Sequence, residues 1–128
     1  MMELVFLTIL LALLEYVVMA AMVGRARVKY GIKAPATTGN PDFERVNRVH
    51  INTLESLVVF VPGVWIFAFY VSELWAAVLG AVFVIGRAVY AVGYYQAADK
   101  RGPGAGLTGI VNLVLIAGGL FGLGRALL

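Results

Sequence analysis

Three polar residues recur at helical spacing in the segment after residue 40, and together they could bind a small charged molecule. Arg48, Asn52 and Glu55 are separated by four and three residues. At ~100° per residue they fall within about 60° of one another on a helix. The segment therefore predicts a helical face that carries a cation, an amide and a carboxylate.

A second set of polar residues lies further along the chain, again at spacings that return to one side of a helix. Its members are Arg87, Tyr90, Tyr94 and Arg101. The last three follow Arg87 by three, seven and fourteen residues, so all four share one face if the helix continues to Arg101. We therefore expect two helices with matching polar faces.

The residue types on these faces indicate a ligand with charges of both signs. Arginines bind carboxylates, Glu55 could bind an ammonium group, and Asn52 and the tyrosines suit peptide groups. This set favours a small zwitterion with several carboxylates. The simpler interpretation is structural. A charge near a bilayer centre costs at least ~2.5 kcal/mol, so Glu55 and Arg87 would turn inward and neutralise each other.

Arg101 allows two interpretations, because it stands directly before Gly102 and Pro103 at the end of the tyrosine stripe. It could complement a helix dipole or anchor the chain to lipid phosphate. Alternatively, its guanidinium could lie close to a ligand thiol and favour the nucleophilic thiolate, without itself losing a proton.

The composition indicates that these faces lie within a membrane. Of the 128 residues, 62% are hydrophobic and 13% are charged, and the mean hydropathy is +0.92. Soluble domains have about 25% charged residues. A span needs about 20 residues, so the length accommodates four spans with short loops. We predict an all-α integral membrane four-helix bundle of up-down-up-down topology, with residues 1–128 forming a single domain.

The positions of apolar runs and helix breakers predict where these helices lie. We expect the first over residues 4–23, followed by a loop over residues 24–40. Asn40 caps the second, which runs from Pro41 to about Val71. The third extends from a turn at Ser72 and Glu73 to the break at Gly102 and Pro103, and the fourth covers residues 106–124.

The positive charges gather beside the first and third connections, which an up-down-up-down bundle brings to one side of the membrane. The opposite side has only Arg125. This asymmetry predicts that loops 24–50 and 97–106 are cytoplasmic and that both termini lie on the opposite side. The cations near the two loops are Arg25, Arg27, Lys29, Lys33, Arg45, Arg48, Lys100 and Arg101.

Several other kinds of site find little support. The chain has no cysteine, and His50 has no second histidine beside it, so we expect no metal site. Glu15 interrupts the first apolar run without an aligned polar stripe, and we expect it to have a buried partner such as Arg87. Gly118 and Gly122, like Ala20 and Gly24, have the spacing of small residues that allows membrane helices to approach closely.

Two segments carry a family resemblance. ATTGNPDFERVNRVHINTLE (residues 36–55) contains the pattern ERxxRxxxNxxE, and RAVYAVGYYQAADKR (residues 87–101) contains RxxYxxGY followed by an arginine. Together they resemble the MAPEG family, the membrane-associated proteins of eicosanoid and glutathione metabolism, and especially its leukotriene-forming and glutathione-conjugating members. Ser56 and His50 depart from the leukotriene-forming pattern, which has a tyrosine and a glutamine there.

The resemblance implies a homotrimer of four-helix subunits that binds glutathione between adjacent subunits near the cytoplasmic side. Arg101 matches the arginine that stabilises the thiolate, and the partner subunit's Arg27 would contribute to binding. The other residues that would hold glutathione are Arg48, Asn52, Glu55, Arg87, Tyr90 and Tyr94.

We therefore predict a membrane-bound glutathione transferase, with glutathione as co-substrate, that activates the thiolate for attack on a lipophilic electrophile. The same thiolate could reduce peroxides. Two alternatives stay open. One is a non-catalytic member of the family that binds a lipid or presents it to a partner, and the other is a structural or transport bundle whose charges neutralise one another.

Overall fold

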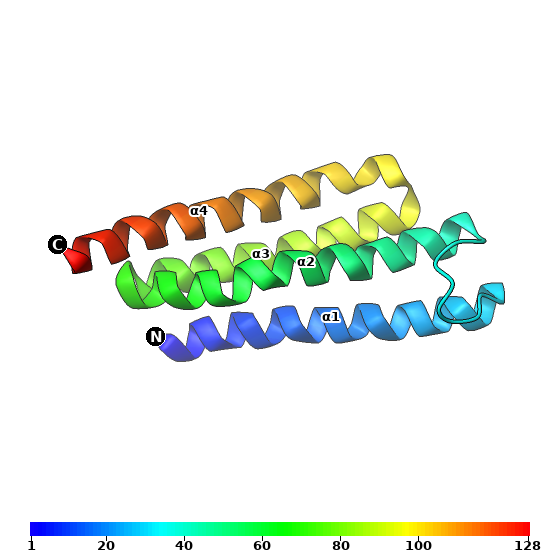
Figure 1. Ribbon diagram of the computed structural model, residues 1–128, viewed down its shortest axis with the longest axis horizontal. Helices are drawn as coiled ribbons and strands as arrows, with labels where there is room; N and C mark the ends of the chain where they lie inside the picture. The colour runs from blue at the N-terminus through cyan, green and yellow to red at the C-terminus, as the bar shows by residue number, and fades with distance from the viewer.

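The computed structural model describes all residues from Met1 to Leu128, and nearly all of them lie in four long α-helices (Figure 1). A short 3₁₀ helix, η1, precedes the last of them. The elements are α1 (Met2–Tyr30), α2 (Pro41–Tyr70), α3 (Glu73–Gln96), η1 (Ala98–Arg101) and α4 (Gly102–Leu127). The predicted all-α four-helix bundle is confirmed.

Side-chain caps fix the starts of the two central helices, at the predicted cap Asn40 and at Ser72, which was predicted only as part of a turn. The Asn40 side-chain oxygen accepts hydrogen bonds from the backbone N–H groups of Asp42 and Phe43, at 2.9 and 3.1 Å. Ser72 Oγ similarly accepts one from the backbone N–H of Trp75 at 3.2 Å. These bonds satisfy donors that the first turn of a helix leaves free, so α2 and α3 begin close to the predicted residues.

The predicted end of the first helix was wrong, because α1 continues through residues 24–30. This stretch includes Arg25, Ala26, Arg27 and Lys29, which are all good helix formers. Its basic side chains also complement the negative end of the helix dipole. α1 ends where Gly31 adopts a left-handed conformation with φ of 67°.

The junction after α3 also differs from the prediction. α3 ends at Gln96, and Ala97 is extended, so no continuous helix reaches Gly102. The chain then folds back so closely that a Cβ at Gly93 would collide with the backbone carbonyl of Lys100. Because η1 completes this reversal, α4 starts at Gly102 rather than near residue 106.

α2 and α3 lie in the middle of the bundle, and each packs against both α1 and α4. At the centre of the core the rings of Phe60 and Phe83 stack with their centroids 3.9 Å apart. Gly118 and Gly122 allow α4 to approach α2, because a Cβ at either position would meet Phe67 or Tyr70. Both termini lie at one end of the bundle and the connections 31–40 and 97–101 at the other (Figure 1).

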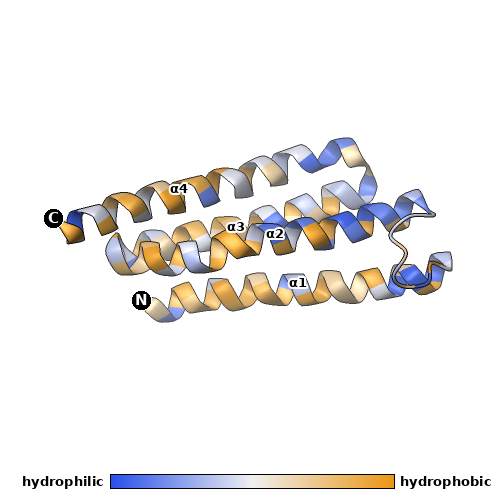
Figure 2. Cartoon of the chain, viewed as in Figure 1, coloured by the Kyte–Doolittle hydropathy of each residue, from blue (hydrophilic) through white to orange (hydrophobic).

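All four helices are long and apolar enough to cross a membrane. Large hydrophobic side chains are exposed along their outer faces, including Leu10 and Val17 on α1 and Leu113 and Leu120 on α4. Hydrophilic residues concentrate at the end that holds the two longer connections (Figure 2). The bundle therefore has an apolar outer surface and one polar end, as expected of a membrane-spanning chain.

Candidate functional site

The most deeply buried charged group is the Arg87 guanidinium, which joins three helices. Arg87 is only 2% exposed. Its Nη1 donates to Thr108 Oγ1 on α4 at 3.1 Å, and its Nη2 donates to Thr53 Oγ1 and Asn52 Oδ1 on α2 at 2.8 and 3.1 Å. The guanidinium carbon also lies 4.1 Å from the centre of the Tyr90 ring. Neutral oxygens and an aromatic face therefore solvate this cation.

No carboxylate forms an ion pair with Arg87. The ion pairs in the structure join Arg45 to Asp42 and the N-terminal amine to Glu3. The structural interpretation in which Glu55 and Arg87 neutralise each other is therefore wrong. The expected partner of Glu15 is also missing, since its Oε1 is buried without a hydrogen bond. The bundle thus holds a positive charge for which the chain supplies no paired anion.

Arg87 determines which way the Asn52 amide points. A guanidinium has only donors, so the oxygen of Asn52 must face it and the NH₂ group must point elsewhere. That NH₂ group makes no hydrogen bond within the chain, and Asn52 lies on the wall of a cleft. Arg87 therefore leaves the Asn52 NH₂ group free to donate to a carboxylate or carbonyl of a ligand.

The cleft lies between α2 and α4, with Arg87 of α3 at its base, and has a volume of about 350 Å³. Its wall is almost wholly polar or small, in contrast to the apolar surface of the rest of the bundle. It includes three of the predicted residues, Asn52, Glu55 and Arg87. The complete lining is Asn52, Glu55, Ser56, Arg87, Ala105, Thr108 and Gly109.

The tyrosine stripe continues from Arg87 toward the polar end of the bundle. The rings of Tyr90 and Tyr94 meet edge to face with their centroids 5.6 Å apart. The Arg101 guanidinium carbon lies 5.6 Å from the Tyr94 ring, and Arg101 Nη1 donates to the carbonyl of Ala98 at 3.0 Å. Arg101 therefore joins the stripe, although it does so from η1 and not from a continued α3. It stays exposed, at the start of α4.

Two predicted arginines lie outside this group of contacts. Arg48 is exposed on α2 and makes no hydrogen bond or ion pair within the chain. Arg27 Nη1 donates to the carbonyl of Ala36 at 2.8 Å, and its guanidinium lies 5.0 Å from the Phe43 ring. Arg27 thus secures the connection between α1 and α2 and does not line the cleft of its own chain.

Comparison of the sequence with models of known protein families shows to which family this chain belongs. The model described as the MAPEG family matches residues 4–121, which is nearly the whole chain. The chain belongs to the MAPEG family. With four apolar helices of sufficient length, this MAPEG chain is an integral, multi-pass membrane protein.

The relatives of this MAPEG chain include enzymes that are named for their substrates or products. It is 41% identical to human microsomal glutathione S-transferase 2, over 79% of this chain and 69% of that protein. It is 36% identical to leukotriene C4 synthase of Cavia porcellus, over 72% of this chain and 61% of that protein. It is also 54% identical to an uncharacterised protein of Synechocystis, over 86% of this chain and 80% of that protein.

The sequence prediction missed the hydroxyl groups that hold Arg87 in this MAPEG chain. Thr53 and Thr108 are fully buried, and Thr108 Oγ1 also donates to the carbonyl of Gly104 at 3.1 Å. Asn112 was also missed. Its Nδ2 donates to the side-chain and backbone oxygens of Ser56, at 3.1 and 3.3 Å. Threonines and an asparagine within apolar segments, combined with one unpaired arginine, were the available signal.

Close packing of α3 against α4 supports the base of the cleft. A Cβ at Gly104 would overlap the backbone of Tyr90, and one at Gly86 would lie 2.8 Å from Thr108 Cγ2. The two glycines therefore allow the helix backbones to approach until Thr108 reaches Arg87. Even small side chains at these positions would move apart the groups that hold the guanidinium.

Proposed function

We propose that this MAPEG chain is a membrane-bound glutathione transferase. The observation that carries this proposal is the buried Arg87, which has no paired anion and directs the Asn52 NH₂ group into a cleft shared with Glu55. The named relatives, a microsomal glutathione S-transferase and a leukotriene C4 synthase, support the choice of glutathione as co-substrate.

The polar groups are complementary to glutathione, a tripeptide with two carboxylates, one ammonium group and two peptide bonds. The Asn52 NH₂ group would donate to a carboxylate or peptide carbonyl, and Glu55 would accept from the ammonium group. Arg48 would bind a carboxylate, because its guanidinium has no partner within the chain. Tyr90, Tyr94 and the positive charge of Arg87 would complete the site.

The proposed role of Arg101 is to stabilise the glutathione thiolate. A nearby guanidinium favours the ionised sulfur, and arginine keeps its own proton. The thiol proton passes to water, and the sulfur attacks an electrophilic carbon of an apolar substrate that enters from the lipid. A carbon–sulfur bond forms as the bond to the leaving group breaks. The same thiolate could reduce a hydroperoxide, in which two glutathiones yield a disulfide, an alcohol and water.

We further propose that residues 1–128 form one functional unit and assemble as a homotrimer, with the partner subunit's Arg27 completing the glutathione site. Residues 24–50 and 97–106 hold the surplus of positive charge around the connections 31–40 and 97–101. This surplus supports a cytoplasmic location for both segments. The site would then face the compartment that supplies glutathione, while its apolar co-substrate arrives through the bilayer.

Purified protein in detergent tests the proposal directly. Titration calorimetry should detect glutathione binding, ultraviolet difference spectra should show bound thiolate, and a nitro-activated aromatic halide should be conjugated. At neutral pH, Arg101→Ala should weaken the thiolate signal and conjugation about tenfold but keep glutathione binding. Lys100→Ala, which removes the neighbouring exposed cation, is the matched control and should keep all three.

Two results would reject the proposal. Absence of glutathione binding by the wild-type protein at millimolar concentration would remove glutathione as the co-substrate. Binding without thiolate or conjugation in the wild type would instead favour a non-catalytic protein that binds or presents a lipid.

A further inference from the structure

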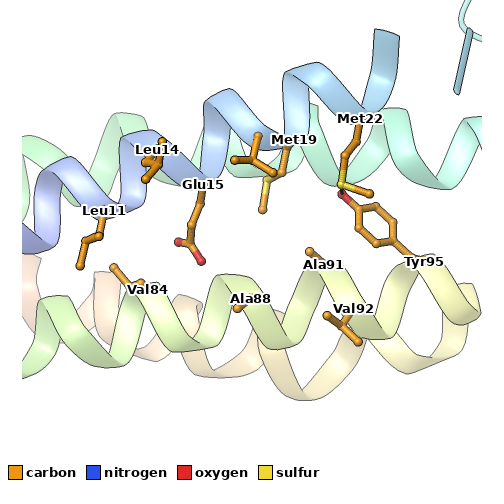
Figure 3. A pocket seen from close by; sticks show the side chains of 11 residues that line it. Leu11, Leu14, Glu15, Met19, Met22, Val84, Ala88, Ala91, Val92 and Tyr95 are labelled. Carbon is orange, nitrogen blue, oxygen red and sulfur yellow. Dashed lines mark hydrogen bonds between the residues drawn. The ribbon is translucent and has the colours of Figure 1, made fainter. Parts of the chain in front are cut away.

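A second site of different character lies between α1 and α3. There the two helices form an apolar groove of about 320 Å³, whose eleven lining residues include one charged residue, Glu15. Figure 3 shows the Glu15 side chain extending from α1 toward α3, with Val84 and Ala88 opposite it. No residue that lines this groove, Glu15 included, also lines the cleft that contains Asn52 and Arg87.

The groove continues along the same two helices toward the N-terminal end of α1. An adjoining cavity of about 460 Å³ shares Leu11 and Val84 with it and is lined by further apolar side chains, such as Leu4 and Val78. The walls of both cavities come from α1 and α3 alone. Together they extend the apolar groove along the surface of α1 and α3, and the Glu15 carboxyl group lies part-way along it.

The Glu15 carboxyl group has no partner in the chain. Its Oε1 is buried without a hydrogen bond, and no cation lies within ion-pair distance. Tyr95 is the one residue of the groove with a hydroxyl group, and it donates that hydroxyl to Met22 Sδ at 3.5 Å. A carboxyl group at this depth is costly unless something pairs with it. A donor supplied by a bound ligand would satisfy this carboxyl group.

We propose that this groove binds a lipophilic amine, whose ammonium group pairs with Glu15 and whose alkyl chain lies along α1 and α3. Charge complementarity selects this class. An ammonium group donates to a carboxylate in a charge-assisted bond, whereas the carboxylate of a fatty acid would be repelled and an alcohol would bind less strongly. From Leu11 to Met22 the groove follows about 16 Å of helix, long enough for an extended alkyl chain.

The small side chain of Ala88 is the second requirement of the proposal. Ala88 lies on α3 opposite Glu15 (Figure 3), and both residues line the groove. Because its side chain is a single methyl group, we place the ammonium group beside it. Ala88→Leu would fill this space while keeping the carboxyl group. Ala117 provides a matched control, since it is an exposed alanine on α4 that lines none of the cavities described here.

The experiment uses the full chain in nanodiscs of zwitterionic phospholipid and a long-chain primary amine that carries a diazirine in its alkyl chain. After photolysis, mass spectrometry should find the label on peptides from α1 and α3. Glu15→Gln and Ala88→Leu should each reduce this labelling about tenfold, whereas Ala117→Leu should leave it unchanged. An alcohol probe of the same length should label the wild type only as weakly as the amine labels Glu15→Gln.

Other outcomes would overturn the proposal. Equal amine labelling of the wild type and Glu15→Gln would mean that the carboxyl group does not select the ligand. Absence of label on α1 and α3 in the wild type would mean that the groove is closed, for example by a second copy of the chain. Circular dichroism and thermal melting of each variant would establish that its fold is intact. The labelling assay contains no glutathione, so its result does not depend on glutathione binding.

Discussion

Arg87 Nη2 donates to Asn52 Oδ1 over 3.1 Å, and this bond fixes the direction of an amide at the wall of the cleft. The two residues are on different helices, and the same nitrogen also donates to Thr53. Asn52 therefore serves as an acceptor toward the interior of the bundle and as a donor toward a ligand. These two roles of Asn52 can be tested separately from the proposed activation of the glutathione thiol.

Asn52→Asp separates the two roles of the asparagine. The carboxylate keeps an acceptor for Arg87, so the melting temperature should be unchanged or higher. Its second oxygen replaces the NH₂ donor and would repel a ligand carboxylate, so glutathione affinity should fall about tenfold or more. Calorimetry and thermal melting on one preparation measure both quantities. Unchanged affinity would show that the Asn52 NH₂ group does not face the ligand.

Gly104 and Gly106 form a matched pair on α4. A methyl group at Gly104 would overlap the Tyr90 backbone, so Gly104→Ala should destabilise the protein by about 1–3 kcal/mol and loosen the contact between Thr108 and Arg87. Gly106 has nothing near its Cβ position, so Gly106→Ala should stabilise the helix by about 0.5–1 kcal/mol. Denaturation in mixed detergent micelles measures the two changes. Effects of the same sign would contradict the close approach of α3 and α4.

The sequence was sufficient to predict the number of helices, the cap at Asn40 and the polar faces of the two central helices. Each depends on a local rule, such as the length of a span, the preference of a cap or the helical period. The helix ends at the polar end of the bundle were harder to predict. Residues 24–30 of α1 are polar but remain helical, and Ala97 breaks α3 without a proline or glycine at that position.

The partners of Arg87 and Glu15 required the structure. Charge alone favoured an ion pair with Glu55 or Glu15, yet hydroxyl groups and an amide hold Arg87. Threonine causes little disturbance to an apolar pattern, so its presence there is a weak signal and does not identify the residue that its hydroxyl binds. That Glu15 has no partner follows only from the packing of α1 against α3.

Single cysteines can test the proposed orientation, because the natural chain has none. Lys33 is exposed in the connection between α1 and α2, and Arg125 is exposed in the last turn of α4. That connection and the end of α4 lie at opposite ends of the bundle (Figure 1). The protein is produced in bacteria, and the cells are converted to spheroplasts, whose inner membrane is intact. If the surplus of positive charge faces the cytoplasm, an impermeant maleimide added to these spheroplasts should label Arg125→Cys. Lys33→Cys should react only after lysis. The reverse pattern would mean that both termini are cytoplasmic.

The pH dependence of turnover tests whether Arg101 acts on the thiolate. A guanidinium near the sulfur lowers the pKa of the bound glutathione thiol, so the thiolate persists to lower pH. Arg101→Ala should raise that pKa and shift the rise of kcat with pH upward by about one unit, which corresponds to about tenfold lower turnover at neutral pH. Lys100→Ala should keep the wild-type profile. If Arg101→Ala lowered kcat equally at every pH, the arginine would act by positioning substrate, and thiolate stabilisation would not be its role.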